Sequence, residues 1–172
     1  MAHRIRPMLP DDKAILFDIL NAIPEFSPTD VQIAREVIDS YLQDPSGSGY
    51  YILVAEITKK ISGYICYGST PLTQGTWDIY WIATSPEKQG QGIGSDLIAF
   101  AESRIMESGG RLIMIETSSR PEYEKTVRFY RSRGYEEICR IPDFYTPGDD
   151  KLILQKRLDR QLPGVLSEIR AD

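Results

Sequence analysis

The chain has 172 residues, of which 41% are hydrophobic, enough for one domain with a sizeable core. Its 20 basic and 25 acidic residues are mixed along the sequence and leave a net charge of −5, which argues against a nucleic-acid-binding protein. No apolar run has the length of a membrane span, and the N-terminus lacks the apolar stretch of a secretory signal. We therefore expect a cytoplasmic protein without a membrane partner.

Candidate metal ligands and histidine catalysts are scarce. The two cysteines, Cys66 and Cys139, are far apart in strand-like runs, so we expect both to be reduced and buried rather than to bind a metal. The single histidine, His3, lies next to the N-terminus, which argues against a histidine triad or a zinc site. Acid–base chemistry would then fall to Tyr, Asp, Glu or water.

The hydrophobic pattern predicts a strand, two helices and a three-stranded meander in the first half of the chain. Ser27 followed by Pro28 is typical of a helix start, with an N-cap residue and a proline at the first position. In chain order, the expected elements are a strand at 3–9, helices at 10–23 and 27–45, and strands at 49–57, 61–70 and 75–84.

The second half is predicted to alternate helices and strands before a final antiparallel pair. The expected elements are a helix at 95–110, a strand at 111–119, a helix at 120–134, and strands at 135–141 and 150–158. This order indicates an α/β (α+β) fold, a mixed central sheet of about seven strands with flanking helices. We expect one domain at 1–158 and a polar tail at 159–172, which could carry a short helix after Pro163.

Residues 85–96, SPEKQGQGIGSD, place three glycines just before a predicted helix. A glycine-rich turn that opens a helix exposes N–H groups without intrahelical partners, and with the helix dipole it favours an anion, most often phosphate. Gly92 and Gly94 lack the Cβ atoms that would keep a phosphate away, and Ser95 or the backbone of Ile93 could complete the site. The other interpretation is a surface loop with convenient glycines.

Three phosphate-binding motifs compete for this loop. A Walker loop is excluded because no lysine follows the last glycine. A dinucleotide fingerprint would use Gly90, Gly92 and Ser95, with Glu116 near the position of the ribose-binding acid. Against it, residues 85–89 separate the strand from the glycines, and the upstream strands form a meander.

The third motif fits: residues 89–94, QGQGIG, match the Q/R-x-x-G-x-G/A signature of the GNAT acetyltransferase superfamily, which holds the pyrophosphate of acetyl-coenzyme A. Residues 78–102 resemble that family's strand–loop–helix core, and residues 129–137, FYRSRGYEE, resemble the end of its next helix. The order of elements also agrees over 3–158. The resemblance implies a GNAT fold and an N-acetyltransferase that uses acetyl-coenzyme A and no metal.

The resemblance also implies roles for individual residues. Tyr130 matches the general acid that reaches the coenzyme A sulfur, although a core aromatic residue is the other interpretation. The oxyanion donor would be a backbone N–H near Ile82 or Ala83, where the family bulges this strand and splays it from the next. Tyr123 and Thr126 replace an asparagine and an alanine that are common in the family, so the asparagine contact cannot be carried over. The expected contacts to acetyl-coenzyme A are Ile82, Ala83, Thr84, Gln89, Gly90, Gln91, Gly92, Ile93, Gly94, Ser95, Tyr123, Thr126, Tyr130 and Arg133.

The general base and the acceptor are less defined by the sequence. Asp78 and Tyr80 alternate along one strand face, and Glu116 ends the neighbouring strand, so the base could be Asp78, Glu116 or a water relay. We expect a primary amine of a small molecule as acceptor, or of a peptide or protein. The expected specificity segments are residues 20–37 and the last hairpin, where Asp143, Tyr145, Asp149 and Asp150 could face the amine or only shape the turn. The alternative is a non-catalytic acyl-coenzyme A sensor, and a homodimer is a family-level expectation.

Overall fold

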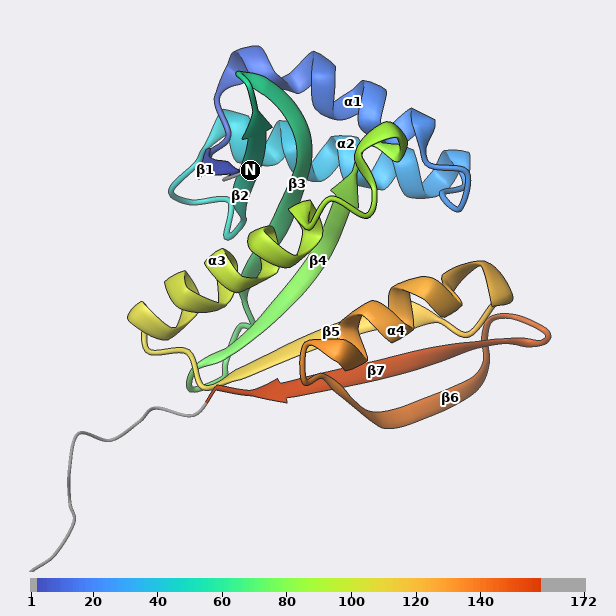
Figure 1. Ribbon diagram of the computed structural model, residues 1–172. Coiled ribbons are helices and arrows are strands. Elements are labelled where there is room, and N and C mark those ends of the chain that lie inside the picture. The colour runs from blue at the N-terminus through green and yellow to red at the C-terminus, as the bar shows by residue number, and fades with distance from the viewer. Residues whose placement is uncertain (1–2, 159–172) are drawn as a thin grey trace, which may run out of the picture.

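The chain folds around a seven-stranded sheet in the order β1-β2-β3-β4-β5-β7-β6 (Figure 1). This computed structural model describes residues 3–158. The strands are β1 (Arg4–Pro7), β2 (Tyr51–Ile57), β3 (Lys60–Ser69), β4 (Thr76–Thr84), β5 (Leu112–Ser118), β6 (Glu136–Thr146) and β7 (Asp149–Arg157). The α-helices are α1 (Lys13–Ala22), α2 (Pro28–Gln43), α3 (Ile93–Glu107) and α4 (Glu124–Ser132), and short 3-10 helices lie at Pro10–Asp12, Pro86–Lys88 and Pro121–Tyr123. The predicted mixed α/β fold is confirmed, and the predicted tail lies outside the described residues.

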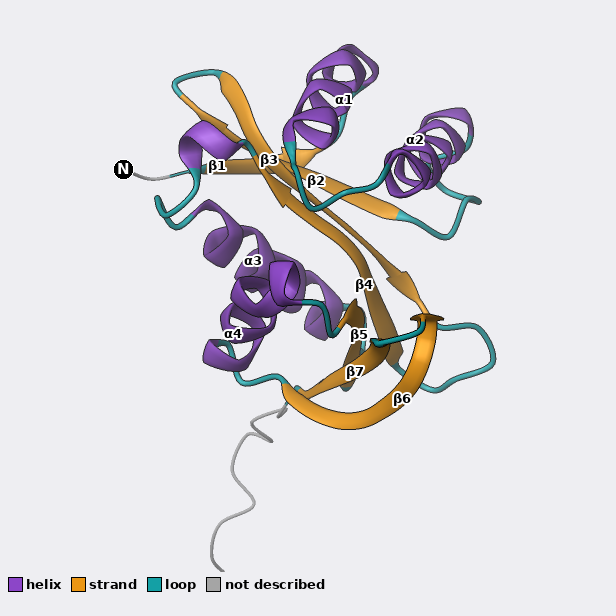
Figure 2. Cartoon of the chain, turned by 90° about the vertical axis from the view of Figure 1, so that its right-hand side faces the viewer, coloured by secondary structure: helices purple, strands orange, loops and turns teal. Residues whose placement is uncertain are grey.

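Helices cover both faces of the sheet, and the strands alternate their side chains between two cores (Figure 2). On β2, Ile52 and Val54 pack under α1 and α2, whereas Leu53 and Ala55 pack under α3. This period-two alternation makes both faces of β2 apolar, which explains the nearly uninterrupted hydrophobic run in its sequence. The core on the α3 side continues through Tyr130 of α4.

The predicted start of α2 is confirmed by its capping contacts. The hydroxyl of Ser27 accepts a hydrogen bond from the backbone N–H of Asp30 at 3.2 Å, and the Asp30 carboxylate accepts one from the backbone N–H of Ser27 at 2.8 Å. This reciprocal pair satisfies two donors at the helix N-terminus. It also fixes the chain between α1 and α2, which borders the site described below.

Two strands of the sheet diverge at its centre. Strands β4 and β5 are parallel and pair from Thr76 with Leu112 to Ile79 with Ile115, yet both continue beyond these residues. On its other side β4 pairs with β3, and a register shift leaves Tyr80 as an extra residue between Ile79 and Trp81. Such a bulge bends its strand. The gap between the ends of β4 and β5 therefore opens directly after the bulge.

The expectation that both cysteines are buried is wrong for Cys139. Cys66 is buried between β2 and β4, whereas Cys139 is exposed on β6. The reason is the position of β6 at the edge of the sheet, where nearly all of its residues are exposed. Among the described residues, no helix is long and apolar enough to cross a membrane, and no cluster of three or more potential metal ligands occurs.

Candidate active site

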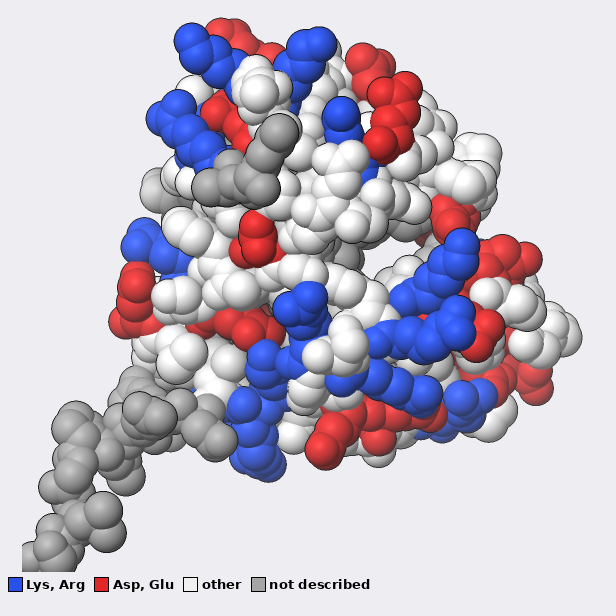
Figure 3. Space-filling model, viewed as in Figure 1, with Lys and Arg blue, Asp and Glu red and all other residues white. Residues whose placement is uncertain are grey.

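The gap between β4 and β5 is the floor of a cleft of about 1010 Å³. Figure 3 shows the opening between the part of the molecule formed by α1 and α2 and the part formed by α4, with Lys and Arg side chains gathered on α4. Residues from the α1–α2 connection, β4, the glycine loop, β5, α4 and the β6–β7 hairpin line it. They include Glu25, Phe26, Asp30, Asp78, Tyr80, Ile82, Ala83, Thr84, Lys88, Gln89, Gly90, Ile93, Gly94, Ser95, Glu116, Arg120, Tyr123, Lys125, Thr126, Tyr130, Tyr145 and Asp149.

The glycine loop ends as an uncapped helix N-terminus at this cleft. Gly90 and Gly92 have φ angles of +77° and +84°, in the left-handed region that favours glycine. Gly92 is the N-cap residue of α3, and no described side chain caps the helix there. The first N–H groups of α3 are therefore free to bind an anion, which fits the phosphates of coenzyme A. Gly94 is helical, and a Cβ at this position would meet Phe129 at an ordinary 3.5 Å.

The free edge of β4 offers backbone donors and acceptors to the same cleft. The N–H of Ser85 donates to the carbonyl of Ser62 on the β3 side. Because bonding alternates along an antiparallel pair, the peptide groups of Ala83 face β3, while those of Ile82 and Thr84 face the gap. This geometry favours Ile82 over Ala83 as a source of the expected backbone donor.

Tyr130 projects from α4 into the wall of the cleft. It is 5% exposed and packs against the rings of Phe129 and Tyr135, with centroids 5.4 and 5.8 Å away. Burial raises the pKa of Tyr130. The phenol is therefore protonated at neutral pH and available as a donor. Tyr130 is thus part of the core and also lines the cleft, and its role as general acid stays a prediction.

The two candidate bases lie on the sheet face that points away from α3, and each has a partner. The carboxylate of Asp78 accepts a hydrogen bond of 2.5 Å from the hydroxyl of Thr70. The carboxylate of Glu116 forms an ion pair with Lys151 of β7. Tyr80 lies over the same face, and burial together with the charge of Asp78 raises the pKa of Tyr80 to about 12. Both carboxylates are therefore already engaged by a side chain of the protein.

The predicted coenzyme A contacts divide into two groups. Most of them line the cleft, Tyr123 and Thr126 included, whereas Gln91, Gly92 and Arg133 do not. Arg133 contacts the hydroxyl of Ser95, which brings the end of α4 to the start of α3. The hydroxyl of Tyr123 donates to the backbone carbonyl of Glu25 at 3.1 Å and so joins α4 to the α1–α2 connection.

His3 lies at the glycine loop, which the sequence did not predict. Its Nδ1 lies 2.5 Å from a carboxylate oxygen of Asp96 in the first turn of α3, and 5% of its side chain is exposed. A Cβ on Gly92 would approach the His3 ring to 3.9 Å. The sequence around His3 gives no signal for this contact, because Asp96 lies 93 residues further along the chain.

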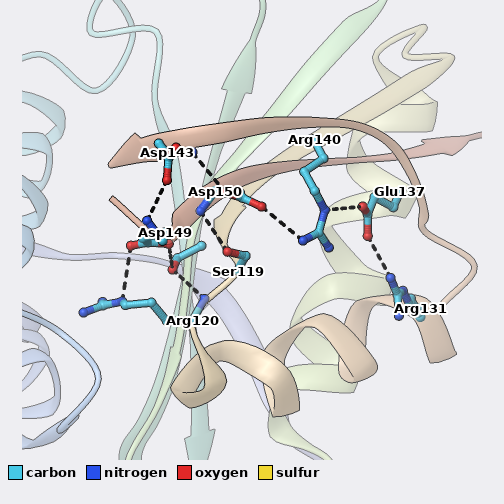
Figure 4. A network of polar contacts seen from close by, with 10 residues as sticks. Ser119, Arg120, Arg131, Glu137, Arg140, Asp143, Asp149 and Asp150 are labelled. Atoms are coloured by element: carbon cyan, nitrogen blue, oxygen red, sulfur yellow. Dashed lines mark hydrogen bonds and ion pairs between the residues drawn. The ribbon is translucent and has the colours of Figure 1, made fainter. Parts of the chain in front are cut away.

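The last hairpin contributes one of its three aspartates to the cleft. Asp149, labelled in Figure 4, is buried and accepts a hydrogen bond of 2.5 Å from Ser118. Asp150 instead pairs with Arg140 and accepts the backbone N–H of Asp143, whose carboxylate accepts the N–H of Gly148. Asp143 and Asp150 thus shape the turn, as the turn interpretation predicted.

Comparison with known proteins agrees with this geometry. The acetyltransferase (GNAT) family profile matches residues 15–135. The chain belongs to the GNAT acetyltransferase family. It is therefore an acyltransferase, and the resemblance noted in the sequence is confirmed.

Three individual proteins illustrate the similarity in fold and in sequence. A crystal structure of a protein assigned to the GNAT family from Desulfovibrio desulfuricans has a TM-score of 0.87 and 35% identity, over 91% of this chain and 99% of that one. An aminoglycoside 6'-N-acetyltransferase complexed with coenzyme A shares the fold, with a TM-score of 0.73 and 17% identity over 91% of this chain and 98% of that one. An S-alkylcysteine N-acetyltransferase from Bacillus subtilis is 35% identical over 60 residues, which span 34% of this chain and 33% of the relative.

Proposed function

We propose that this GNAT protein transfers the acetyl group of acetyl-coenzyme A to a primary amine of a small molecule by direct attack. The observation that carries the proposal is the meeting of two features in one cleft: the uncapped N-terminus of α3 and the free edge of β4 beside Tyr130. The first suits an anionic cofactor, and the second suits a thioester reaction. A peptide or protein amine is the second candidate acceptor.

Each chemical demand of the reaction has a candidate residue. When bound, acetyl-coenzyme A supplies the thioester carbonyl that the amine attacks. The N–H groups of Ile93, Gly94 and Ser95 bind phosphate, and the N–H of Ile82 stabilises the oxyanion. Tyr130 donates a hydrogen bond to the departing sulfur. A thiol has an ordinary pKa of about 8.5, lower than that of the buried phenol, so Tyr130 stabilises the thiolate without losing its own proton fully.

Asp78 is the better candidate to receive the proton of the amine, directly or through water. Its hydrogen-bond partner Thr70 is neutral, whereas the partner of Glu116 is the cation Lys151. The partner of Asp78 carries no charge that competes for its carboxylate, and we therefore assign the role of base to Asp78.

A small acceptor is supported by the name of the Bacillus subtilis relative, whose substrate class is a modified amino acid. The hydrogen bond between Tyr123 and Glu25 joins two segments that line the cleft, which favours compact molecules over long peptides. The free cysteines Cys66 and Cys139 fit the reducing cytoplasm, where we place the enzyme.

The test is release of coenzyme A thiol from acetyl-coenzyme A in the presence of polyamines, aminoglycosides, amino acids and peptides. Turnover with a small amine, and loss of most of that turnover in Tyr130→Phe, is the expected result. Tight binding of acetyl-coenzyme A without turnover on any acceptor would instead support a non-catalytic sensor. Preferred turnover of peptides would support the second acceptor class.

A further inference from the structure

Arg120 is a cleft-lining arginine that forms an ion pair with Asp149 through its Nε. It follows β5, and its closest carboxylate oxygen, Oδ2 of Asp149, lies 3.4 Å from Nε. Among residues 3–158, its guanidinium donates no hydrogen bond to a carboxylate. Arg6 shows the contrast, because its two terminal nitrogens donate to Asp12 at 2.6 and 2.9 Å. The terminal N–H groups of Arg120 are thus open to an anion in the cleft.

Arg120 is nevertheless held in position. Its backbone N–H donates to the hydroxyl of Ser118 at 3.1 Å, and that hydroxyl donates to Asp149. Its guanidinium lies over the ring of Tyr123, 5.3 Å from the centroid. Figure 4 shows Arg120 reaching Asp149 from the side opposite to Arg140. A cation fixed by such contacts loses little freedom when it binds a ligand.

The distribution of charge in the cleft fits a molecule that carries both an ammonium and a carboxylate. Asp78 and Glu116 line the cleft from β4 and β5, where an amine would be held and deprotonated. Arg120 lines it from the end of β5, and a guanidinium presents two parallel N–H groups that match a carboxylate. The other cleft cations, Lys88 and Lys125, are less suited, because an ammonium lacks the two parallel N–H groups of a guanidinium.

We infer that Arg120 binds the carboxylate of the acceptor, and that the acceptor is an amine with a nearby carboxylate, as in an α-amino acid. This inference rests on the proposed acetyltransferase function and narrows its acceptor class. Arg120 acts as a specificity residue, and its contribution is to binding of the acceptor rather than to the chemical step.

The experiment compares acceptors that differ in the carboxylate. Steady-state kinetics are measured with L-methionine, L-phenylalanine and S-benzyl-L-cysteine, each against its carboxamide, and with spermidine and tyramine. The wild type is expected to prefer an acid over its amide by about 10- to 100-fold in kcat/KM, the range of a hydrogen-bonded charge pair. Arg120→Gln should remove this preference through a higher KM for the acid, with the KM for acetyl-coenzyme A unchanged. Arg120→Lys should restore part of it.

Arg104→Gln is the matched control, because Arg104 is an exposed arginine of α3 that pairs with Glu107 and does not line the cleft. It should retain the wild-type preference. Equal turnover of acids and amides, or an acid preference that Arg120→Gln leaves unchanged, overturns the inference and leaves the acetyltransferase proposal standing. Absence of turnover with every acceptor contradicts the proposed function, and the inference with it.

Discussion

The hydroxyl of Tyr123 donates a hydrogen bond of 3.1 Å to the backbone carbonyl of Glu25, a residue 98 positions earlier in the chain. Tyr123 is the N-cap residue of α4, and Glu25 lies between α1 and α2. The bond therefore connects two segments that line the cleft and that we propose border the acceptor. From the sequence, Tyr123 is expected to contact coenzyme A, whereas in the structure its phenol is bonded to the backbone of Glu25.

Tyr123→Phe should weaken acceptor binding and leave cofactor binding unchanged. A neutral hydrogen bond contributes about 1 kcal/mol, so we expect about a fivefold lower kcat/KM for the acceptor. The KM for acetyl-coenzyme A should stay within about twofold. Tyr51→Phe, at an exposed tyrosine that stacks on Tyr67, is the control. A rise in the KM for acetyl-coenzyme A instead would indicate that Tyr123 contacts the cofactor, as the sequence predicted.

Alanine substitutions at two glycines of the loop should affect coenzyme A binding to different extents. Gly92→Ala forces a side chain into the left-handed region at φ +84°, which costs about 1–2 kcal/mol and distorts the loop. We expect a rise of about tenfold or more in the dissociation constant of coenzyme A, measured by calorimetry. Gly94→Ala places its Cβ in ordinary contact with Phe129, within a helix, and should bind coenzyme A almost normally. The G/A choice at the last position of the signature agrees with this geometry.

Tyr130→Phe should lower kcat more than it changes either KM. Removal of a donor to the leaving group costs about 10- to 100-fold when that donor acts in the transition state. Burial raises the pKa of Tyr130, so the wild-type rate should show no loss from its ionisation between pH 6 and about pH 9. The measurement is the pH dependence of kcat with a saturating acceptor. An unchanged kcat in the variant contradicts the role of Tyr130 as donor and leaves it as a packing residue.

Isosteric amide substitutions can distinguish the roles of Asp78 and Glu116, the two carboxylates on the cleft floor. Asp78→Asn should lower kcat by about 100-fold near pH 7, the typical contribution of a general base. Glu116→Gln should change kcat by less than about threefold, because the carboxylate of Glu116 is already engaged in the ion pair with Lys151. Rates measured from pH 6 to 9 should show the larger loss for Asp78→Asn at low pH. The reverse order would assign the base to Glu116, and small effects in both would assign it to water.

Local signals explain why much of the fold could be predicted. The start of α2 follows from Ser27 and Pro28, since capping involves residues next to one another. The glycine loop follows from residues 89–94, because positive φ angles at Gly90 and Gly92 are a property of the loop itself. The order of strands and helices follows from the periodicity of apolar residues.

The remaining features depend on pairing between distant segments. The family resemblance implied a bulge in this strand, but the bulge at Tyr80 exists only relative to β3, and no residue of β4 signals it by itself. The contact of His3 with Asp96 joins the N-terminus to α3, and its sequence separation is 93 residues. Cys139 was expected in the core because its strand has apolar residues, but burial follows from the position of β6 at the sheet edge.

The buried cluster of Arg6, Asp12 and Glu56 should make stability depend on pH. Burial alone would raise the pKa of Asp12, but hydrogen bonds from Arg6 and from the backbone N–H of Leu9 outweigh it and lower the pKa. A carboxylate with a lowered pKa stabilises the fold above its ordinary pKa of about 3.9, and this contribution is lost as the pH falls through the lower folded value.

Asp12→Asn should therefore destabilise the protein by about 3 kcal/mol near pH 7, since it leaves Arg6 without one of its two partners. Urea unfolding at several pH values measures the difference from the wild type, which should shrink as the pH falls below about 4 because the wild type then also loses the charge. Asp11→Asn is the control, because Asp11 is exposed in the same turn. A difference that stays constant down to pH 3 would mean that Asp12 stabilises the turn through its shape and hydrogen bonds rather than through its charge.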